Sequence, residues 1–347
     1  MTGDGRRVTI NTIALEAGVS VPTVSRVLNG RSDVSPSTRE RVEHLLQVHG
    51  YRRRVSRQSG RVNLIDLVFN DLDSPWAVEL IRGVEDVTHA AGVGTVVSAV
   101  HRRSAATKLW LQNLRARTSD GVIFVTSDLT PPVYSELHRL GIPVVVVDPA
   151  GVADADVPTI GATNWAGGRC ATEHLVSLGH RRIALIAGPK HLLCSRARLD
   201  GYRAALEAAG LPVDERLVQQ GDFMHESGFA AAGALLDLPE PPTAIFASSD
   251  TMALGAYEAA RRRGLRVPDD LSVIGFDDLP EARWSSPPLT TIRQPLAEMG
   301  VLAARTALRL AQGERIETPR VELATDLVVR HSTAAPRSGA AGPPRPE

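Results

Sequence analysis

Apolar residues near the N-terminus recur at the spacing of one helical face. They lie three and four positions apart: Ile10, Ile13, Ala14 and Ala17. Thr9 precedes them as a candidate helix cap. Gly18 follows at the place where many helices end in a left-handed residue. The pattern predicts a short helix that ends before Gly18.

A second apolar face begins only a few residues later. Ser20 is a candidate cap, and Pro22 suits the first turn of a helix, where its missing N–H costs little. The predicted buried face is Val24, Val27 and Leu28, and the predicted outward set is Val21, Pro22, Ser25, Arg26 and Asn29. Two helices joined by a short turn form a helix-turn-helix, whose second helix enters the DNA major groove. Spacing alone would also fit a generic helical hairpin.

The letters of this segment are more specific than its spacing. The string A-x-x-A-G-V-S-x-x-T-V-S-R-V-L-N resembles the DNA-binding headpiece of the lactose-repressor/galactose-repressor (LacI/GalR) family. The stretch from Val34 to Val42, with Ser35 as cap and Pro36 at the first helical position, resembles the third helix of that headpiece. The resemblance implies a DNA-binding domain over residues 1–51. The resemblance and the outward face of the second helix predict these DNA-contacting residues: Thr9, Ser20, Val21, Pro22, Thr23, Ser25, Arg26, Asn29, Ser35 and Tyr51. Arg53 and Arg54 are added for their charge, since they depart from the family pattern.

Residues 52–61 are predicted to form a basic hinge linker. In the family a leucine in this linker wedges into the minor groove, but here Gly60 stands at its position, and Arg53 and Arg54 replace the usual Pro-Asn. The arginines could grip phosphates or a narrow minor groove. A solvated, disordered linker is the alternative, and the sequence leaves both open.

Charge separates this N-terminal part from the rest. Residues 1–61 hold eleven arginines and five acidic residues, a net charge of +6 in a chain whose total is zero. A basic segment attached to an acidic body suits a part that meets the phosphate backbone. The chain has 347 residues, which allows two or three domains, and with aromatics at only 4% its core must be aliphatic.

From residue 62 onward, apolar runs alternate with helical patterns. The predicted strands are 62–69, 95–101, 121–125, 144–148, 183–187, 243–248 and 271–276. The predicted helices are 76–91, 104–117, 131–140, 164–178, 198–209, 226–237, 251–263 and 295–312. Such alternation predicts an α/β fold with parallel sheets covered by helices on both faces.

This body resembles the effector-binding core of the same family, which is similar to periplasmic binding proteins. The resemblance implies two lobes over residues 62–330, the first from about 62–161 and 293–330 and the second from about 162–292. The tail 331–347 is rich in Ala, Pro and Gly and is predicted to be disordered.

Candidate ligand residues lie where predicted strands end, because ligands of open α/β sheets bind there. Asp73 and Trp76 follow the first strand, and a carboxylate beside an indole is suited to a sugar. The alternative is that Asp73 or Ser74 caps a helix and Trp76 belongs to the core. Asp148 ends another strand, with a local turn as its alternative role. The resemblance adds further effector-binding residues: Arg198, Phe223, Ser249, Asp250, Asp277 and Gln294.

Enzymatic motifs are missing from the sequence. It has no G-x4-G-K-[ST] and no G-x-S-x-G, and Gly92-x-Gly94 stands in the wrong context for a dinucleotide loop. The histidines lack metal-ligand spacing, and Cys170 and Cys194 suggest neither a zinc site nor a disulfide framework. We therefore expect no enzyme, no cofactor and no metal. Without a signal peptide or an apolar run of roughly 20 residues, a cytoplasmic protein is expected.

These observations predict a sequence-specific transcription regulator, read as a repressor, that binds palindromic operator DNA as a homodimer. A small sugar between the lobes would control operator affinity. The order of residues from Asp66 to Trp76 resembles that of xylose-responsive regulators, which suggests xylose or a xyloside as the effector. Trp284 is predicted to anchor the dimer interface. The alternatives are a sugar-binding receptor without DNA binding and, less favoured, a sugar-processing enzyme.

Overall fold

The computed structural model describes residues 9–28, 34–49, 63–100, 104–125, 131–151 and 157–337. The chain divides into two compact units, Met1–Gly60 and Arg61–Glu347.

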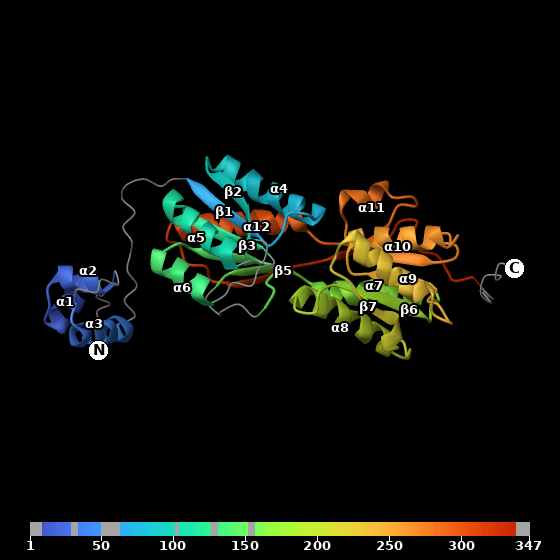
Figure 1. Cartoon of the computed structure of the whole chain (residues 1–347), viewed down its shortest axis with the longest axis horizontal. Coiled ribbons are helices and arrows are strands. Elements are labelled where there is room, and N and C mark those ends of the chain that lie inside the picture. Colours follow the sequence, from blue (N-terminus) through green and yellow to red (C-terminus); the bar gives the residue numbers. More distant parts are fainter. Residues whose placement is uncertain are drawn as a thin grey trace, which may run out of the picture. The chain divides into compact units, whose positions relative to one another are not determined.

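Within its described residues, 9–28 and 34–49, the N-terminal unit contains three helices, α1 (Ile10–Ala17), α2 (Val21–Leu28) and α3 (Pro36–Val48) (Figure 1). The Thr9 hydroxyl accepts a hydrogen bond from the Thr12 N–H at 3.3 Å, and Gly18 ends α1 with a φ of 63°. All three helices contribute to a small apolar core: Ile13, Ala14, Ala17, Val24, Val27, Val34 and Val42. The predicted helix-turn-helix and third helix are confirmed.

The first lobe of the larger unit is built on a six-stranded sheet in the order β11-β5-β4-β3-β1-β2. Its strands are β1 (Leu64–Phe69), β2 (Gly94–Ala99), β3 (Gly121–Val125), β4 (Val144–Val147), β5 (Thr159–Ala162) and β11 (Arg320–Leu323). All neighbouring pairs are parallel.

Helices cover both faces of this sheet. They are α4 (Pro75–Ala90), α5 (Ser104–Arg117), α6 (Pro131–Leu140) and α12 (Leu296–Ala311). Successive strand residues point to opposite faces, so Leu67 packs with α4 and α12 while Val68 packs with α5 and α6. Both faces are therefore buried, as the near-continuous apolar strands predicted.

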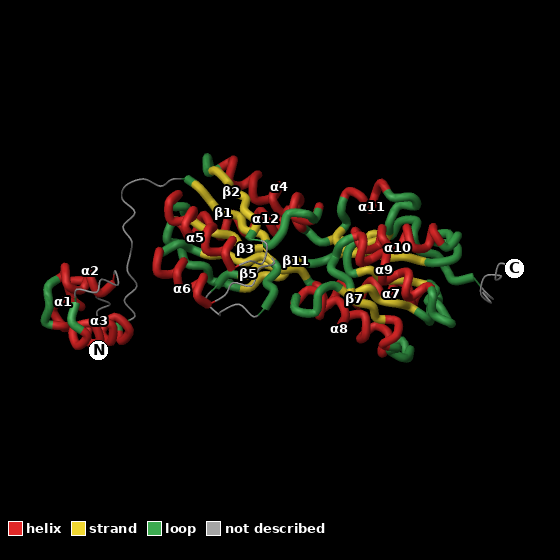
Figure 2. Tube along the Cα trace, viewed as in Figure 1, coloured by secondary structure: helices red, strands yellow, loops and turns green. Residues whose placement is uncertain are grey.

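The second lobe repeats this layering of helices on a sheet (Figure 2). Its strand order is β12-β10-β9-β8-β6-β7. Its strands are β6 (Ile183–Ala187), β7 (Val218–Gln220), β8 (Ala244–Ala247), β9 (Ser272–Asp277), β10 (Thr290–Arg293) and β12 (Asp326–Val328). Its helices are α7 (Asn164–Ser177), α8 (Leu193–Ala208), α9 (His225–Leu236), α10 (Asp250–Arg262) and α11 (Pro280–Trp284), with the short 3-10 turn Glu215–Leu217. The predicted α/β class with two lobes of mainly parallel strands is confirmed.

The chain passes between the lobes three times, between β5 and α7, between β10 and α12, and between β11 and β12. The third passage corrects the predicted lobe boundary, which placed all of residues 293–330 in the first lobe. β12 instead pairs antiparallel with β10 in the second sheet. At this passage the Thr163 and Thr325 hydroxyls lie 3.0 Å apart, which ties two of the connections together.

The predicted disordered tail is wrong for its first part. Residues 331–337 run along the second lobe, and Ser332 is fully buried there. The Ser332 hydroxyl donates to the Val273 carbonyl and accepts from the Thr290 N–H at 2.8 Å. These backbone partners order a segment whose composition alone suggested disorder. Residues 338–347 lie outside the described part of the chain.

Within the described ranges, no helix has the length and apolarity to cross a membrane.

Candidate functional site

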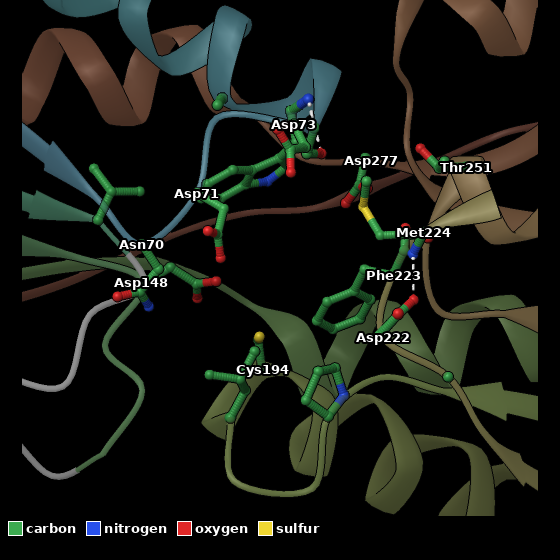
Figure 3. A pocket seen from close by; sticks show the side chains of 18 of the residues that line it. Asn70, Asp71, Asp73, Asp148, Cys194, Asp222, Phe223, Met224, Thr251 and Asp277 are labelled. Carbon is green, nitrogen blue, oxygen red and sulfur yellow. Dashed lines mark hydrogen bonds between the residues drawn. The ribbon is translucent and has the colours of Figure 1, made fainter. Parts of the chain in front are cut away.

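A cavity of about 690 Å³ lies between the two lobes of the larger unit (Figure 3). Its walls come from the carboxyl ends of strands in both sheets and from the helices that follow them. The first lobe contributes Phe69, Asn70, Asp71, Asp73, Ser74, Trp76, Ala77, Val125 and Asp148. The second contributes Pro189, Lys190, His191, Leu192, Cys194, Arg198, Gln220, Gly221, Asp222, Phe223, Met224, Ser249, Thr251 and Asp277. The structure thus brings seven of the predicted ligand residues to one place: Asp73, Trp76, Asp148, Arg198, Phe223, Ser249 and Asp277.

The segment after β1 both caps α4 and lines the cavity. Ser74, not Asp73, caps α4, because the Ser74 hydroxyl accepts from the Trp76 N–H at 3.3 Å. Asp73 is therefore left at the cavity rim. Trp76 is half-buried, packs against the first-lobe core and also lines the cavity. The core and ligand roles that we weighed for Trp76 are compatible.

Asp148 follows β4 directly and adopts a left-handed φ of 49°. Its side chain is only 6% exposed, and burial raises the pKa of its carboxyl group. The Cys194 thiol, from α8 in the other lobe, lines the same cavity and lowers the pKa of this carboxyl group against the larger effect of burial. Burial also raises the pKa of the thiol, so Cys194 stays protonated at neutral pH.

The Arg198 side chain is held by two hydrogen bonds and by contacts with two aromatic rings. Its Nε donates to Asn164 Oδ1 at 2.9 Å, and its Nη1 donates to the Ser248 carbonyl at 2.6 Å. Its guanidinium carbon lies 3.7 Å from the centre of the Phe276 ring and 5.5 Å from that of Phe223. Flat aromatic faces favour a cation. The predicted helix start at residue 198 is wrong, since α8 begins at Leu193 and places Arg198 within its second turn.

Asp277 ends β9 with a φ of 123° and is 4% exposed. Its Oδ1 lies 3.8 Å from Arg198 Nη1 and accepts from Gln294 Nε2 at 2.6 Å. Burial raises the pKa of Asp277 to about 7, against the opposing effect of Arg198. Gln294 does not line the cavity, so the structure corrects its predicted place: it contacts Asp277 rather than the open space.

Asp250 also lies away from the cavity, contrary to our prediction. It is fully buried; its Oδ2 accepts from the Leu279 N–H at 2.8 Å and its Oδ1 from the Thr291 hydroxyl. A methyl group at Gly275 would overlap Asp250 Oδ1, so that glycine makes room for the carboxyl group. The side chain therefore joins β9, β10 and the start of α11. Its neighbour Ser249 caps α10 and lines the cavity.

The sequence patterns did not predict several of the residues that line the cavity. They include Asn70, Asp71, Lys190, His191, Cys194, Gln220, Asp222, Met224 and Thr251. Asn70 and Asp71 follow β1, and Lys190 follows β6, so the rule of strand ends would have found them. Gln220 and Asp222 depend on β7, a three-residue strand that the apolar pattern does not reveal.

In the N-terminal unit, the predicted hydroxyl residues cap helices. The Ser20 hydroxyl accepts from the Thr23 N–H at 3.3 Å, and that of Ser35 from the Thr38 N–H at 3.4 Å. Val21, Pro22 and Arg26 lie on the exposed side of α2. Thr23 and Ser25 are half-buried. The predicted contacts Asn29, Tyr51, Arg53 and Arg54 lie outside the described residues.

Trp284 in α11 is 77% exposed, far more than any core aromatic.

Within the part of the chain that the structure describes, no group of three His, Cys, Asp or Glu side chains is arranged to hold a metal ion.

A helix-turn-helix unit followed in the chain by a two-lobed unit with an interlobe cavity combines a DNA-binding motif with a ligand-binding cleft, as expected of a transcription regulator. Comparison with known proteins gives the family. The model for bacterial regulatory proteins of the lacI family matches residues 9–54, and that for periplasmic binding protein-like domains matches residues 172–333. The HTH-type transcriptional regulator DegA of Bacillus subtilis is 37% identical over 335 residues, covering 94% of this chain and 98% of that protein.

Solved structures agree over nearly the whole chain. A transcriptional regulator CelR–cellobiose complex superposes with a TM-score of 0.73 at 37% identity, covering 94% of this chain and 100% of that one. The lac repressor dimer bound to operator and the anti-inducer ONPF gives 0.70 at 32% identity, covering 95% and 100%. This chain therefore belongs to the lacI family of bacterial regulatory proteins and is a transcriptional regulator.

Proposed function

We propose that this regulator binds two-fold operator DNA as a homodimer and that a small carbohydrate in the interlobe cavity controls its operator affinity. The observation that carries the proposal is the composition of the cavity, whose polar groups come from both lobes. A ligand that contacts both lobes favours one lobe arrangement over another. Such unequal binding is what lets a ligand act on a distant function.

The lining supports a carbohydrate. Arg198 and Asp277 offer a donor and an acceptor in a buried setting, where hydrogen bonds to hydroxyl groups discriminate strongly. Trp76 and Phe223 add aromatic surface for the apolar face of a sugar ring. The solved CelR complex contains cellobiose. The relatives lend no support to xylose in particular, so the proposed class is a small carbohydrate.

On the DNA side, α2 would lie in the major groove with Arg26 as its reading residue. An arginine can donate two hydrogen bonds to one guanine. Val21 and Pro22 offer no side-chain hydrogen bonds and would read thymine methyl groups or shape. One such unit contacts little DNA, so a dimer on a palindromic site is required by geometry. Trp284 is the proposed interface anchor.

The test has two stages. A thermal-shift screen of mono- and disaccharides, xylose included, should find ligands that raise the melting temperature, because binding to the native state alone stabilises it. Hits then enter an operator-binding titration by fluorescence anisotropy with the intact chain. An effector should change operator affinity by roughly 5- to 150-fold. Sugars that bind without changing operator affinity would refute control by the cavity.

A further inference from the structure

The side chain of Asn164 connects the cavity to one of the passages between the lobes. Asn164 is the first residue of α7, follows the passage from β5, and is only 8% exposed. Its Oδ1 accepts from the Arg198 Nε–H at 2.9 Å, and its Nδ2 donates to the Ala162 carbonyl at 3.1 Å. Arg198 lines the cavity, whereas Ala162 ends β5 and belongs to the first-lobe core. One amide group thus joins a ligand-facing cation of the second lobe to a strand of the first.

The residue between Ala162 and Asn164 is the one at which the chain bends. Thr163 has a φ of −71° and a ψ of 64°, the angles of an inverse γ-turn, which is common at strand ends. When lobes move, a few residues at the ends of elements take up the change in φ and ψ. Because the Asn164 side chain bonds to the carbonyl on the far side of Thr163, it favours these two angles.

The bend is also tied to the other passages. The Thr163 hydroxyl accepts from the Thr325 N–H at 3.0 Å, and the Thr325 hydroxyl donates to the Thr163 carbonyl at 3.3 Å. Thr325 lies in the passage between β11 and β12. Gln294, in the passage after β10, donates to Asp277 at 2.6 Å, and Asp277 lies 3.8 Å from Arg198. The three passages therefore meet in one set of contacts around Arg198.

Arg198 itself moves with the second lobe. The Ser248 carbonyl, which follows β8, accepts from its Nη1 at 2.6 Å, and the Phe276 ring of β9 lies 3.7 Å from its guanidinium carbon. A ligand that draws Arg198 toward the first-lobe wall must therefore turn the second lobe, which changes the bend at Thr163. The two hydrogen bonds of Asn164 oppose that change, because they favour one bend.

Resting on the proposed function, we propose that Asn164 is a positioning residue that gives the regulator one preferred lobe angle, away from which a sugar bound to both lobes shifts it. A sugar changes operator affinity only through the difference between its binding to two lobe arrangements. Without the amide group, the chain visits the sugar-bound arrangement before any sugar binds. The sugar then has less to change, and its own binding no longer works against the preferred bend.

Asn164→Asp tests this role, since a carboxylate still accepts from the Arg198 Nε–H but has no hydrogen to donate to the Ala162 carbonyl. The full-length chain is used with the sugar that raises its melting temperature most among glucose, galactose, ribose, xylose, cellobiose and maltose. Fluorescence anisotropy measures affinity, without that sugar and at saturation, for an operator that the wild type selects from random duplexes. The wild-type change of roughly 5- to 150-fold should fall toward one in the variant. Its affinity for the sugar, measured by calorimetry, should stay the same or rise.

Two further variants complete the experiment. Asn164→Ala removes both hydrogen bonds and should lose the operator response as well, with weaker sugar binding because the buried Arg198 Nε–H loses its acceptor. Its response at saturating sugar decides the question if Asn164→Asp does not fold, as judged by circular dichroism and thermal unfolding. Asn113→Asp makes the matched substitution on the exposed side of α5, outside the cavity, and should keep the wild-type response and sugar affinity.

The outcomes separate the two proposals. If saturating sugar changes operator affinity as strongly in the Asn164 variants as in the wild type, Asn164 does no more than support Arg198. The inference is then overturned, and control by a sugar stands. Weaker sugar binding by Asn164→Asp with an unchanged operator response leads to the same conclusion. If none of the six sugars binds the wild type, or if binding leaves operator affinity unchanged, both proposals are overturned.

Discussion

At the scale of single residues, the cavity depends on carboxyl groups that burial has made hard to ionise. Asp277 is held by Gln294 and faces Arg198, yet burial raises its pKa to about 7. The Gln294 Oε1 atom is buried with no hydrogen-bond partner among the described residues. A buried carboxyl group with a raised pKa and a buried amide oxygen without a partner each raise the free energy of the native state, and a bound ligand can lower it again.

That cost predicts how stability depends on pH. The unfolded pKa of Asp277 is the ordinary one of about 3.9, below the folded value, so the folded state binds the proton more tightly. The destabilising contribution is therefore absent below the unfolded pKa, grows as pH rises, and is complete above about 7. Asp277→Asn should remove it. In urea unfolding, the free energy of unfolding of the variant, measured relative to that of the wild type, should rise by about 1–4 kcal/mol between pH 5 and pH 8. A difference between the two proteins that does not change with pH would mean that Asp277 is ionised throughout.

At the scale of elements, two glycines allow α7 and α8 to pack closely enough to position Arg198. A methyl group at Gly201 would overlap the Trp165 carbonyl, and one at Gly168 would overlap the Arg198 carbonyl. The close approach is what lets Asn164, the first residue of α7, accept from the Arg198 side chain. The position of one ligand-facing residue is thus set by helix packing.

Overpacking this contact should damage both stability and the cavity. Gly201→Ala forces the two helices apart and should cost about 1–3 kcal/mol in urea unfolding. It should also weaken binding of any effector, as measured by calorimetry, because Arg198 moves with α8. Gly161→Ala is the matched control, since a methyl group there meets nothing within 4 Å. Equal stability of the two variants would contradict the packing argument.

The second helix of the N-terminal unit carries a prediction of its own. Arg26→Ala removes the side chain best able to recognise a guanine, and should weaken operator binding by about 1–3 kcal/mol. Binding to random DNA should weaken much less, because phosphate contacts dominate there. Anisotropy titrations on operator and scrambled duplexes measure both. An equal loss on the two duplexes would demote Arg26 to a phosphate contact.

At the scale of the whole molecule, function is proposed to require two copies of the chain. Trp284 exposes a large aromatic surface on the short helix α11, just after the strand that ends in Asp277. Large exposed aromatics are typical anchors of protein interfaces. The same α11 region is joined to Asp250 through the Leu279 N–H, so the proposed interface and the second-lobe core share one element.

Trp284→Ala should therefore shift the protein toward monomer in analytical ultracentrifugation. Operator affinity should fall with it, whereas thermal stabilisation by an effector should persist, because Trp284 does not line the cavity. A variant that stays dimeric but no longer responds to effector would assign Trp284 to ligand binding.

Local patterns in the sequence determined the elements. The apolar spacing of residues 10–28 and the caps Thr9 and Ser20 specify a helix-turn-helix through contacts within a few residues, and buried runs such as 121–125 specify strands that both sheet faces cover. The same logic located Asp73 and Asp148, because each follows a strand and parallel strands end at one edge. The family resemblance added Asp277, which is the last residue of its strand.

Only the tertiary structure decided which of these side chains share a cavity. Ser249 and Asp250 are adjacent in sequence, but one faces the cavity and the other is buried against β9 and β10. Strand pairing and backbone partners far away in the chain order β7, β12 and residues 331–337. The sequences of these segments show no apolar periodicity that would have predicted this order. The cavity likewise exists only where the two sheets meet, since its lining groups are distant in sequence and close in space.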